Sequence, residues 1–410
     1  MFRKIIKNIL LLIVEHGARI VSSLLITAIL ARQLTIEDYG YFQYALNLVM
    51  VFSSFCFVCG AEVLVPSLVN VDSNNRKKIL LNVFYIRAIA SLIAYALLIV
   101  FAFSFNNENF YLFLILGLIL ILGEPFQVVT AVLQADTNIG SKIKVTLFSL
   151  FIKLSLLISL YFLKIKDEYL FSLAWVLEYL STALGLFLIF YIKYGNPVGD
   201  FDKKIFLIYL KKGLPFFYSL LAMYLFIRMD MLMLKKLGTE YELGLYSASV
   251  QLGLVVTAIS PILVMSLAPS LVYKHAVEAV VKRNVIIIAL LMFIFSITLV
   301  LLLHIILPYI INLLLGDKFK NSYDILYWYL LASSFLFLDN GLNIYIMKIN
   351  KGYLAGVKWL LSLVVALMLY WIFIPKYGSY GAVIGYFGGY LTASIIGIFY
   401  VCFISMEREK

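Results

Sequence analysis

Long runs of apolar residues, each separated from the next by a short polar segment, fill almost the whole chain. Runs of about 20 residues are long enough for an α-helix to cross the hydrocarbon core of a bilayer. A segment inside a bilayer must pair its own backbone groups, so the runs are predicted to be helices. Twelve spans are expected, at residues 5–31, 41–66, 79–105, 109–133, 143–163, 169–192, 213–234, 244–272, 284–315, 322–347, 353–374 and 379–405.

An internal repeat has a period of about half of the chain. Leu34–Leu48 (LTIEDYGYFQYALNL) resembles Leu237–Leu252 (LGTEYELGLYSASVQL) when one residue is inserted, and Gly40 then aligns with Gly244. Because six spans separate the copies, both copies should have the same orientation in the membrane. We therefore predict an all-α membrane protein with two six-helix lobes that are related by a parallel repeat.

The predicted lobes comprise residues 1–194 and 213–410, and residues 195–212 form a cytoplasmic linker between them. In this linker, lysine pairs flank the apolar stripe of residues 203–212. Such a stripe suits a helix on the membrane surface, and a plain connector is the alternative.

Composition supports a membrane protein and excludes other classes. Hydrophobic residues make up 64% of the chain and charged residues 13%, whereas soluble domains carry about 25% charge. The net charge of +11 does not indicate nucleic-acid binding, because the basic residues lie in short loops rather than in one patch. Twenty Lys and Arg residues lie on the side of the N-terminus and eight on the other side, which predicts that both termini are cytoplasmic.

Ionisable residues inside the spans are candidate functional residues, because a charge in hydrocarbon is costly. We expect the cations to line an internal cavity and bind phosphate groups, and the acids to bind a coupling ion or to balance the cations. Structural charge pairs, such as an i, i+4 pair of Glu15 with Arg19, are the alternative. Lys358 is expected to snorkel to the cytoplasmic surface, and for Arg87 snorkelling is an alternative to lining the cavity. The candidate cations are Arg19, Arg87, Lys153 and Arg228, and the candidate acids are Glu15, Glu124, Glu178, Asp230 and Asp339.

Three prolines inside apolar runs, Pro125, Pro215 and Pro261, predict helix kinks. Such kinks serve either as hinges for a conformational change or as ordinary structural bends. The sequence contains no P-loop, G-x-S-x-G or H-E-x-x-H motif, so we expect no enzymatic activity, no cofactor and no metal site.

Three segments together resemble the O-antigen (Wzx-type) polysaccharide flippase family of the multidrug/oligosaccharidyl-lipid/polysaccharide (MOP) exporter superfamily. They are Ala31–Ala45, Gly213–Leu234 followed by Gly244–Ser249, and Ile374–Ile384. The resemblance implies two six-helix lobes around a cationic cavity, and alternating access that moves a polyprenyl-diphosphate-linked oligosaccharide across the bacterial cytoplasmic membrane. The cargo would be an O-antigen, capsule or exopolysaccharide repeat unit.

The resemblance also implies contact with membrane lipids and association with a polysaccharide polymerase and a chain-length regulator. Arg228 and Asp230 fall in the family's R-x-D stretch, whereas Arg19, Arg87 and Lys153 are assigned from their depth in the spans. Two other functions remain open. A multidrug/cation antiporter would need a cavity of carboxylates and aromatic rings, and a membrane-embedded glycan polymerase would need a larger outer loop than this chain has.

Overall fold

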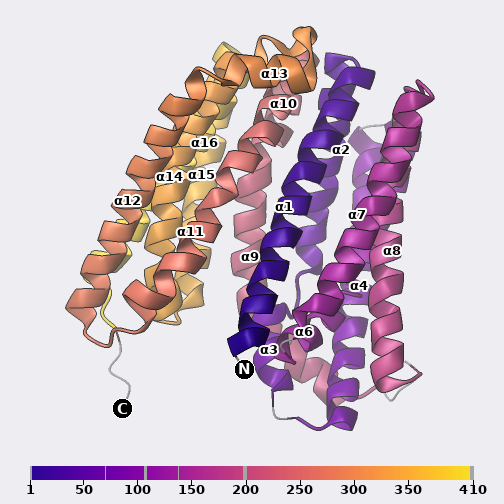
Figure 1. The fold of residues 1–410 in the computed structure, drawn as a ribbon, viewed down its shortest axis with the longest axis vertical. Coiled ribbons are helices and arrows are strands. Elements are labelled where there is room, and N and C mark those ends of the chain that lie inside the picture. Colours follow the sequence, from indigo (N-terminus) through magenta and orange to yellow (C-terminus); the bar gives the residue numbers. More distant parts are fainter. Residues whose placement is uncertain (1, 70, 106–108, 137, 197–200, 407–410) are drawn as a thin grey trace. The chain divides into compact units, whose positions relative to one another are not determined.

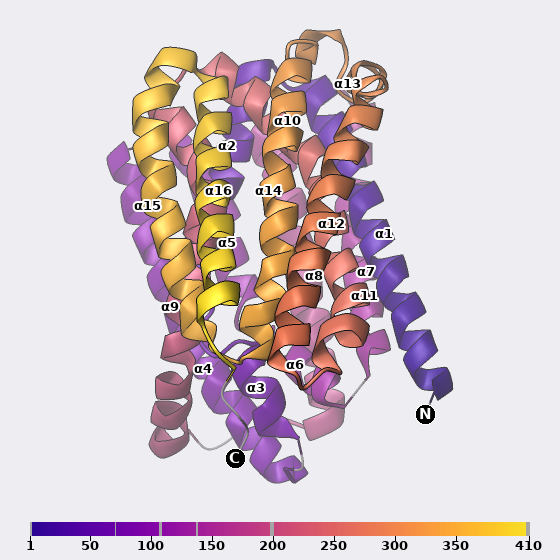
Figure 2. The same ribbon diagram turned by 90° about the vertical axis from the view of Figure 1, so that its left-hand side faces the viewer.

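The computed structural model describes residues 2–69, 71–105, 109–136, 138–196 and 201–406, and all regular elements in these ranges are helices (Figures 1 and 2). Among these described residues, eleven helices are long and apolar enough to cross a membrane. The number becomes twelve when the bent pair Ile36–Cys56 and Ala61–Leu68 is counted as one span. The predicted all-α membrane class is confirmed.

By its internal contacts the chain separates into two compact units. Unit 1 contains Met1–Ile29 and Ala45–Leu221, and unit 2 contains Leu30–Tyr44 and Ala222–Lys410. The predicted linker residues 203–212 form the first part of helix α9 (Lys203–Leu237), which continues without interruption past Pro215. The contacts assign the end of α1 to unit 2. They do not test the lobe boundaries expected from the sequence, which stay a prediction.

Unit 1 is a bundle in which α8 packs against α5 and α7, α4 packs against α5, and the two short helices α3 and α6 pack together. Asp167 begins α8 because its side chain accepts hydrogen bonds from the backbone N–H groups of Tyr169 and Leu170. Gly195, with a φ of 73°, ends this helix. The helices of unit 1 are α1 (Phe2–Gln33), α2 (Ile36–Ser53), η1 (Ser54–Cys56), α3 (Ala61–Leu68), α4 (Ser73–Phe105), α5 (Phe110–Gly123), α6 (Val128–Ala135), α7 (Ile139–Phe162), α8 (Glu168–Tyr194) and the first part of α9.

Unit 2 is built around α14, which packs against α10, α12 and α16, while α15 packs against α16 (Figure 2). Helix α10 begins with a capping box, in which Thr239 and Glu242 each bind a backbone N–H of the other. Besides the end of α1, the start of α2 and the remainder of α9, its elements are α10 (Glu240–Thr257), α11 (Ile259–Ala268), the short π-helix η3 (Pro269–Tyr273), α12 (Glu278–His304), α13 (Leu307–Leu315), η4 (Asp317–Phe319), α14 (Ser322–Lys348), α15 (Gly352–Tyr377) and α16 (Ser379–Phe403).

The two glycines that the repeat aligns lie against each other in unit 2. A Cβ atom on Gly40 would lie 2.6 Å from the backbone nitrogen of Gly244, and a Cβ on Gly244 would lie 2.1 Å from the carbonyl oxygen of Ile36. Real Cβ atoms do not approach backbone this closely, so only glycine fits at either position. The starts of α2 and α10, which are equivalent in the repeat, thus pack backbone to backbone.

Several predicted spans are broken in the structure. The helix breaks between Ser53 and Ala61 in the span 41–66 and between Gly123 and Val128 in the span 109–133, and the span 284–315 was wrong in its extent. Residues 284–315 were expected to form a single helix, but α12 ends at His304 and α13 begins at Leu307. Pro308 lies in the first turn of α13, where its missing N–H costs nothing, and it would break the hydrogen bonds of a longer helix.

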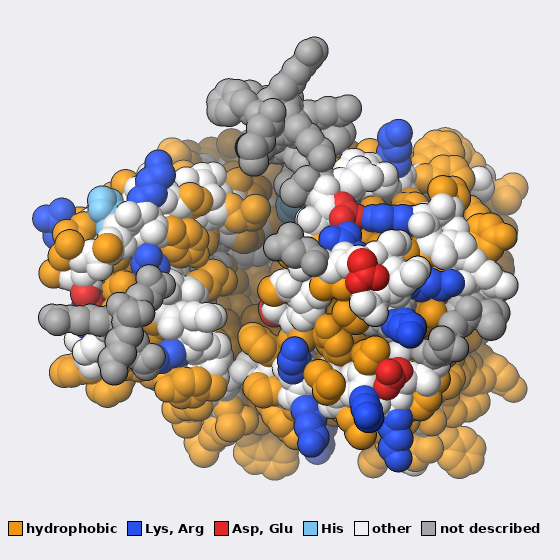
Figure 3. All heavy atoms as spheres, turned by 90° about the horizontal axis from the view of Figure 1, so that it is seen from below, with side chains coloured by type: hydrophobic (Ala, Val, Ile, Leu, Met, Phe, Trp, Pro, Cys, Tyr) orange, Lys and Arg blue, Asp and Glu red, His pale blue; other side chains and the backbone are white. Residues whose placement is uncertain are grey.

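Seen from below, the surface of unit 2 shows several Lys and Arg side chains and few Asp or Glu (Figure 3). This is the end of unit 2 at which α16 finishes (Figure 1). A positive surface of this kind is typical of the cytoplasmic side of a membrane protein.

Candidate functional site

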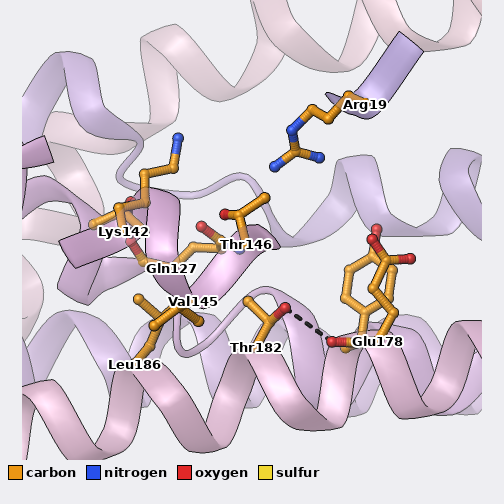
Figure 4. A pocket seen from close by; sticks show the side chains of 10 residues that line it. Arg19, Gln127, Lys142, Val145, Thr146, Glu178, Thr182 and Leu186 are labelled. Atoms are coloured by element: carbon orange, nitrogen blue, oxygen red, sulfur yellow. Dashed lines mark hydrogen bonds between the residues drawn. The ribbon is translucent and has the colours of Figure 1, made fainter. Parts of the chain in front are cut away.

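A pocket of about 160 Å³ opens inside unit 1, among side chains of α1, α6, α7 and α8 and the segment before α6 (Figure 4). Its walls combine two cations, several hydroxyl and amide groups and one carboxylate, which suits a ligand with many hydrogen-bond acceptors. The lining residues are Arg19, Gln127, Thr130, Lys142, Val145, Thr146, Glu178, Tyr179, Thr182 and Leu186.

The two cations, Arg19 of α1 and Lys142 of α7, share a single carboxylate. Oε1 of Glu15 accepts hydrogen bonds from Nε and Nη2 of Arg19 at 3.2 and 3.0 Å, and it lies 3.9 Å from Nζ of Lys142. The side chains of Arg19 and Lys142 are 47% and 29% exposed, whereas that of Glu15 is 3% exposed. Oε2 of Glu15 is buried and has no hydrogen-bond partner in the described part of the chain. The cations therefore keep accessible N–H groups for an anion.

Lys153 lies on the same helix as Lys142 but is already paired. Its Nζ lies 2.9 Å from Oε2 of Glu178, and it sits 3.9 Å from the centroid of the Trp175 ring. Lys153 is buried, while Glu178 contributes to the pocket wall. The pair removes most of the negative charge that Glu178 would otherwise bring to the pocket.

Arg87 of α4 binds backbone carbonyl groups rather than the pocket. Its guanidinium donates to the carbonyl oxygens of Val58 at 3.1 Å, Cys59 at 3.0 Å and Glu124 at 3.2 Å. These carbonyls lie at two helix interruptions, one between η1 and α3 and one between α5 and α6. A broken helix leaves carbonyls without an N–H partner, and in a bilayer another group must supply it. Arg87 thus joins two breaks and is buried in protein, not directed to the membrane surface.

In unit 2, Asp230 of α9 lies among tyrosines. Its Oδ2 accepts a hydrogen bond from the Tyr246 hydroxyl at 2.8 Å, and its Oδ1 accepts one from the N–H of Met231 at 2.7 Å. The Tyr246 ring contacts that of Tyr329. Arg228 is half-buried, and because it lies two residues before Asp230, the two side chains leave different faces of α9.

A buried ion pair connects α14 and α15. Nζ of Lys358 lies 2.6 Å from Oδ1 of Asp339 and also binds the side-chain oxygen of Asn343, which in turn donates to Oδ2 of Asp339 at 2.8 Å. The expectation that Lys358 snorkels to the surface was wrong, because its side chain has no exposed surface. A partner on the next helix offsets the burial of the charge, and this partner is not visible in the pattern of one helix.

The three prolines have different surroundings. Pro125 lies in the interruption between α5 and α6, and Pro261 lies in the first turn of α11, just after α10 ends. Pro215 lies inside α9, which continues on both sides of it. The three prolines therefore do not share one kind of position in a helix, and these positions do not indicate a common hinge.

Lys142 is not among the candidate cations selected from the sequence, because it stands just before the predicted span 143–163 and so resembles a loop cation. A signal was present, however. Lys142, Thr146, Ser149 and Lys153 are spaced by four, three and four residues, which places polar groups on one face of α7. A polar stripe along an apolar helix indicates a face turned toward a cavity or toward polar partners.

The fold and its intramembrane charges define a multi-pass membrane protein. The chain is similar to the lipid II flippase MurJ in an inward closed conformation, with a TM-score of 0.69, 15% identity, and coverage of 97% of this chain and 87% of that one. It is similar to a multidrug resistance MATE family transporter of the MOP superfamily in an inward-facing conformation, with a TM-score of 0.65, 15% identity, and coverage of 95% and 92%.

A MOP superfamily transporter from Pyrococcus furiosus is also similar, with a TM-score of 0.55, 13% identity, and coverage of 98% and 95%. Identities this low establish the fold alone. The sequence profile of the family described as polysaccharide biosynthesis protein matches residues 29–324, and the chain belongs to this family. The comparison with curated proteins gives no match.

Proposed function

We propose that the chain is a flippase for polyprenyl-diphosphate-linked oligosaccharide, which it moves across the bacterial cytoplasmic membrane by alternating access. Membership in the polysaccharide biosynthesis family supports a glycan cargo such as an O-antigen, capsule or exopolysaccharide repeat unit. The fold of this chain is similar to that of MurJ, which is a lipid II flippase. This similarity supports a flippase function.

The observation that carries the proposal is the pair of accessible cations in unit 1. Arg19 binds Glu15 through Nε and Nη2, and the N–H groups of Nη1 remain for a phosphate oxygen, while Lys142 adds a point charge on the same pocket wall. Gln127, Thr146 and Thr182 add neutral polar groups for the remaining oxygens. Each charge-assisted hydrogen bond contributes about 1.5–3 kcal/mol, so two or three are enough to hold a diphosphate.

The remaining candidate cations have different parts in this proposal. Arg87 fixes the helix interruption before α6 and so positions Gln127, which lines the pocket. Lys153 neutralises Glu178 beside the ligand. Arg228, a half-buried cation of α9, is proposed as a further cation for the diphosphate.

The candidate acids divide in a similar way. Glu178 and Asp339 balance charge, because Glu178 pairs with Lys153 at 2.9 Å and Asp339 pairs with Lys358 at 2.6 Å. Glu15 and Asp230 are the proposed coupling groups, since Glu15 has a buried oxygen that is not hydrogen-bonded to any described residue and Asp230 is buried among tyrosines. Glu124 lies at the interruption that Arg87 binds. There its negative charge would balance the positive charge of the guanidinium.

We place the protein in the bacterial cytoplasmic membrane with both termini inside, from the distribution of Lys and Arg along the chain. A polysaccharide polymerase and a chain-length regulator are the partners that a supplier of repeat units would need. Membrane lipids surround the exposed apolar helix faces.

A multidrug/cation antiporter is the second candidate, and Asp230 is the observation that favours it. A carboxylate beside aromatic rings is the chemistry that binds organic cations, and Tyr246 and Tyr329 lie close to Asp230. The two accessible cations of the pocket in unit 1 oppose this function, because they would repel such a cargo.

The test measures on which side of the membrane the lipid-linked glycan lies, in a host that lacks this gene and any other flippase. Wild type and Lys144→Gln should restore glycan to the outer leaflet, because Lys144 is exposed on α7 and does not line the pocket. Arg19→Gln with Lys142→Gln should reduce outer-leaflet glycan at least tenfold. Normal outer-leaflet glycan in the deletion strain would refute the flippase.

A further inference from the structure

A second pocket, of about 600 Å³, lies against α13. Helix α13 is at the end of unit 2 opposite the end of α16 (Figure 1). The pocket is formed by α13, the turn that follows it and the first residues of α14, so it is separate from the pocket in unit 1. With cytoplasmic termini, this end of unit 2 faces the outside of the cell. The lining residues are Pro308, Tyr309, Ile311, Asn312, Gly316, Asp317, Lys320, Asn321, Tyr323 and Asp324.

The walls of this pocket are held by contacts outside it. Arg32 donates to the carbonyl oxygen of Leu313 at 2.7 Å and thereby caps the end of α13, while Lys318 donates to the carbonyl oxygen of Leu34. Phe319 is fully buried and packs edge to face on Tyr39, with ring centroids 5.5 Å apart. The pocket is therefore formed before a ligand arrives, which lowers the entropic cost of binding.

The lining groups select a neutral polar ligand. Asp317 and Asp324 accept hydrogen bonds, Asn312 and Asn321 both donate and accept them, and the ring of Tyr309 is 76% exposed. Two carboxylates against one lysine make the lining unfavourable for phosphate. In the described ranges no cluster of three or more His, Cys, Asp or Glu could hold a metal ion. A sugar, with many hydroxyl groups and an apolar ring face, matches this set of groups.

We propose that this pocket, here called the glycan pocket, binds the oligosaccharide part of the cargo on the outer side of the membrane. The inference rests on the proposed function, because it assigns a saccharide-binding site to the same flippase. The volume falls within the about 300–1,000 Å³ that is usual for ligand pockets. Vicinal hydroxyls would bond to the carboxylates and amides, and one sugar face would stack on Tyr309.

The experiment uses the purified full chain in lipid nanodiscs and the soluble oligosaccharide repeat unit that mild acid releases from the host's own surface polysaccharide. This probe lacks both lipid and diphosphate, so its binding reports the saccharide contact alone. Saturation-transfer NMR should detect binding to wild type. The variants Tyr309→Ala, Asn312→Ala and Asp317→Asn should each weaken binding about tenfold.

The control is Leu313→Ala, on the same helix as Tyr309 but outside the lining, and it should bind like wild type. No detectable binding to wild type at millimolar probe, or equal binding by wild type and the three variants, would overturn the glycan pocket.

A second measurement separates this inference from the proposed function. Arg19→Gln with Lys142→Gln should keep the affinity for the soluble oligosaccharide and lose translocation of the lipid-linked form. If wild type translocates and the glycan-pocket variants bind and translocate like wild type, only the glycan pocket is refuted. If the soluble oligosaccharide binds in the glycan pocket but wild type translocates nothing, the flippase is refuted and the saccharide site stands.

Discussion

The ammonium nitrogen of Lys358 lies 2.6 Å from Oδ1 of Asp339, and neither side chain has any exposed surface. The two residues come from α15 and α14, and Asn343 completes the network by binding both. Such a pair adds little to stability compared with apolar residues of similar volume, but removing one partner leaves a buried charge without compensation. The relationship therefore predicts an asymmetry between single and double substitutions.

Lys358→Met should lower the free energy of unfolding by about 3–5 kcal/mol, because it leaves the carboxylate of Asp339 buried and unpaired. Lys358→Met combined with Asp339→Leu should recover most of this loss. Chemical unfolding in mixed micelles measures both effects, with the exposed Lys274→Met as a control near zero. A double variant less stable than either single variant would contradict this account.

Arg87→Gln and Arg87→Lys should both lower the free energy of unfolding by about 3 kcal/mol or more. The guanidinium donates to three carbonyls at two helix interruptions, and neither replacement presents N–H groups in the same fork. Arg19→Gln should lower the free energy of unfolding by only about 1 kcal/mol, since the Arg19 side chain is 47% exposed and Lys142 remains 3.9 Å from the buried carboxylate of Glu15. If Arg87→Gln were as stable as wild type and lost only translocation, Arg87 would be a ligand of the diphosphate instead.

Gly40→Ala should destabilise unit 2 by about 1–3 kcal/mol, because the new methyl group would lie 2.6 Å from a backbone atom of Gly244. Gly17→Ala is the matched control in α1, where a Cβ meets nothing within 4 Å. That control should gain about 0.5–1 kcal/mol from helix propensity. Thermal unfolding of the purified variants gives both values, and equal effects of the two substitutions would rule out the close contact.

Asp136 should make stability depend on pH at the end of α6. Partial burial raises the pKa of its carboxyl, but the hydrogen bonds and charges of Lys193 and Arg76 outweigh this effect and hold the pKa below its ordinary value. A lowered folded-state pKa adds stability that is complete above the unfolded value of about 3.9 and is lost as pH falls through the folded value.

Asp136→Asn should therefore cost about 1 kcal/mol at pH 7 and less near pH 3. Unfolding in mixed micelles at the two pH values measures the difference. Arg76→Gln with Lys193→Gln should remove the same pH dependence from the otherwise native chain. An Asp136→Asn variant with the same deficit at both pH values would exclude the ion pairs as its cause.

The class of the protein and most of its helices follow from the sequence alone. The length of an apolar run is a local property, and the bilayer leaves such a run no alternative to a helix. The repeat also aligned Gly40 with Gly244. Close backbone contacts explain why both positions require glycine. Residues 284–315 were wrongly read as one span, because hydropathy does not register the break before Pro308.

The partners of the intramembrane charges, in contrast, depend on how the helices pack together. The sequence predicts that each buried charge needs a partner, but the partner depends on the depth and rotation of two helices that pack together. Arg87 binds carbonyls freed by breaks in two other spans, Lys358 binds Asp339 on α14, and Lys142 joins Arg19 at one pocket. A pattern along one helix records which face is polar, and packing between helices sets what that face meets.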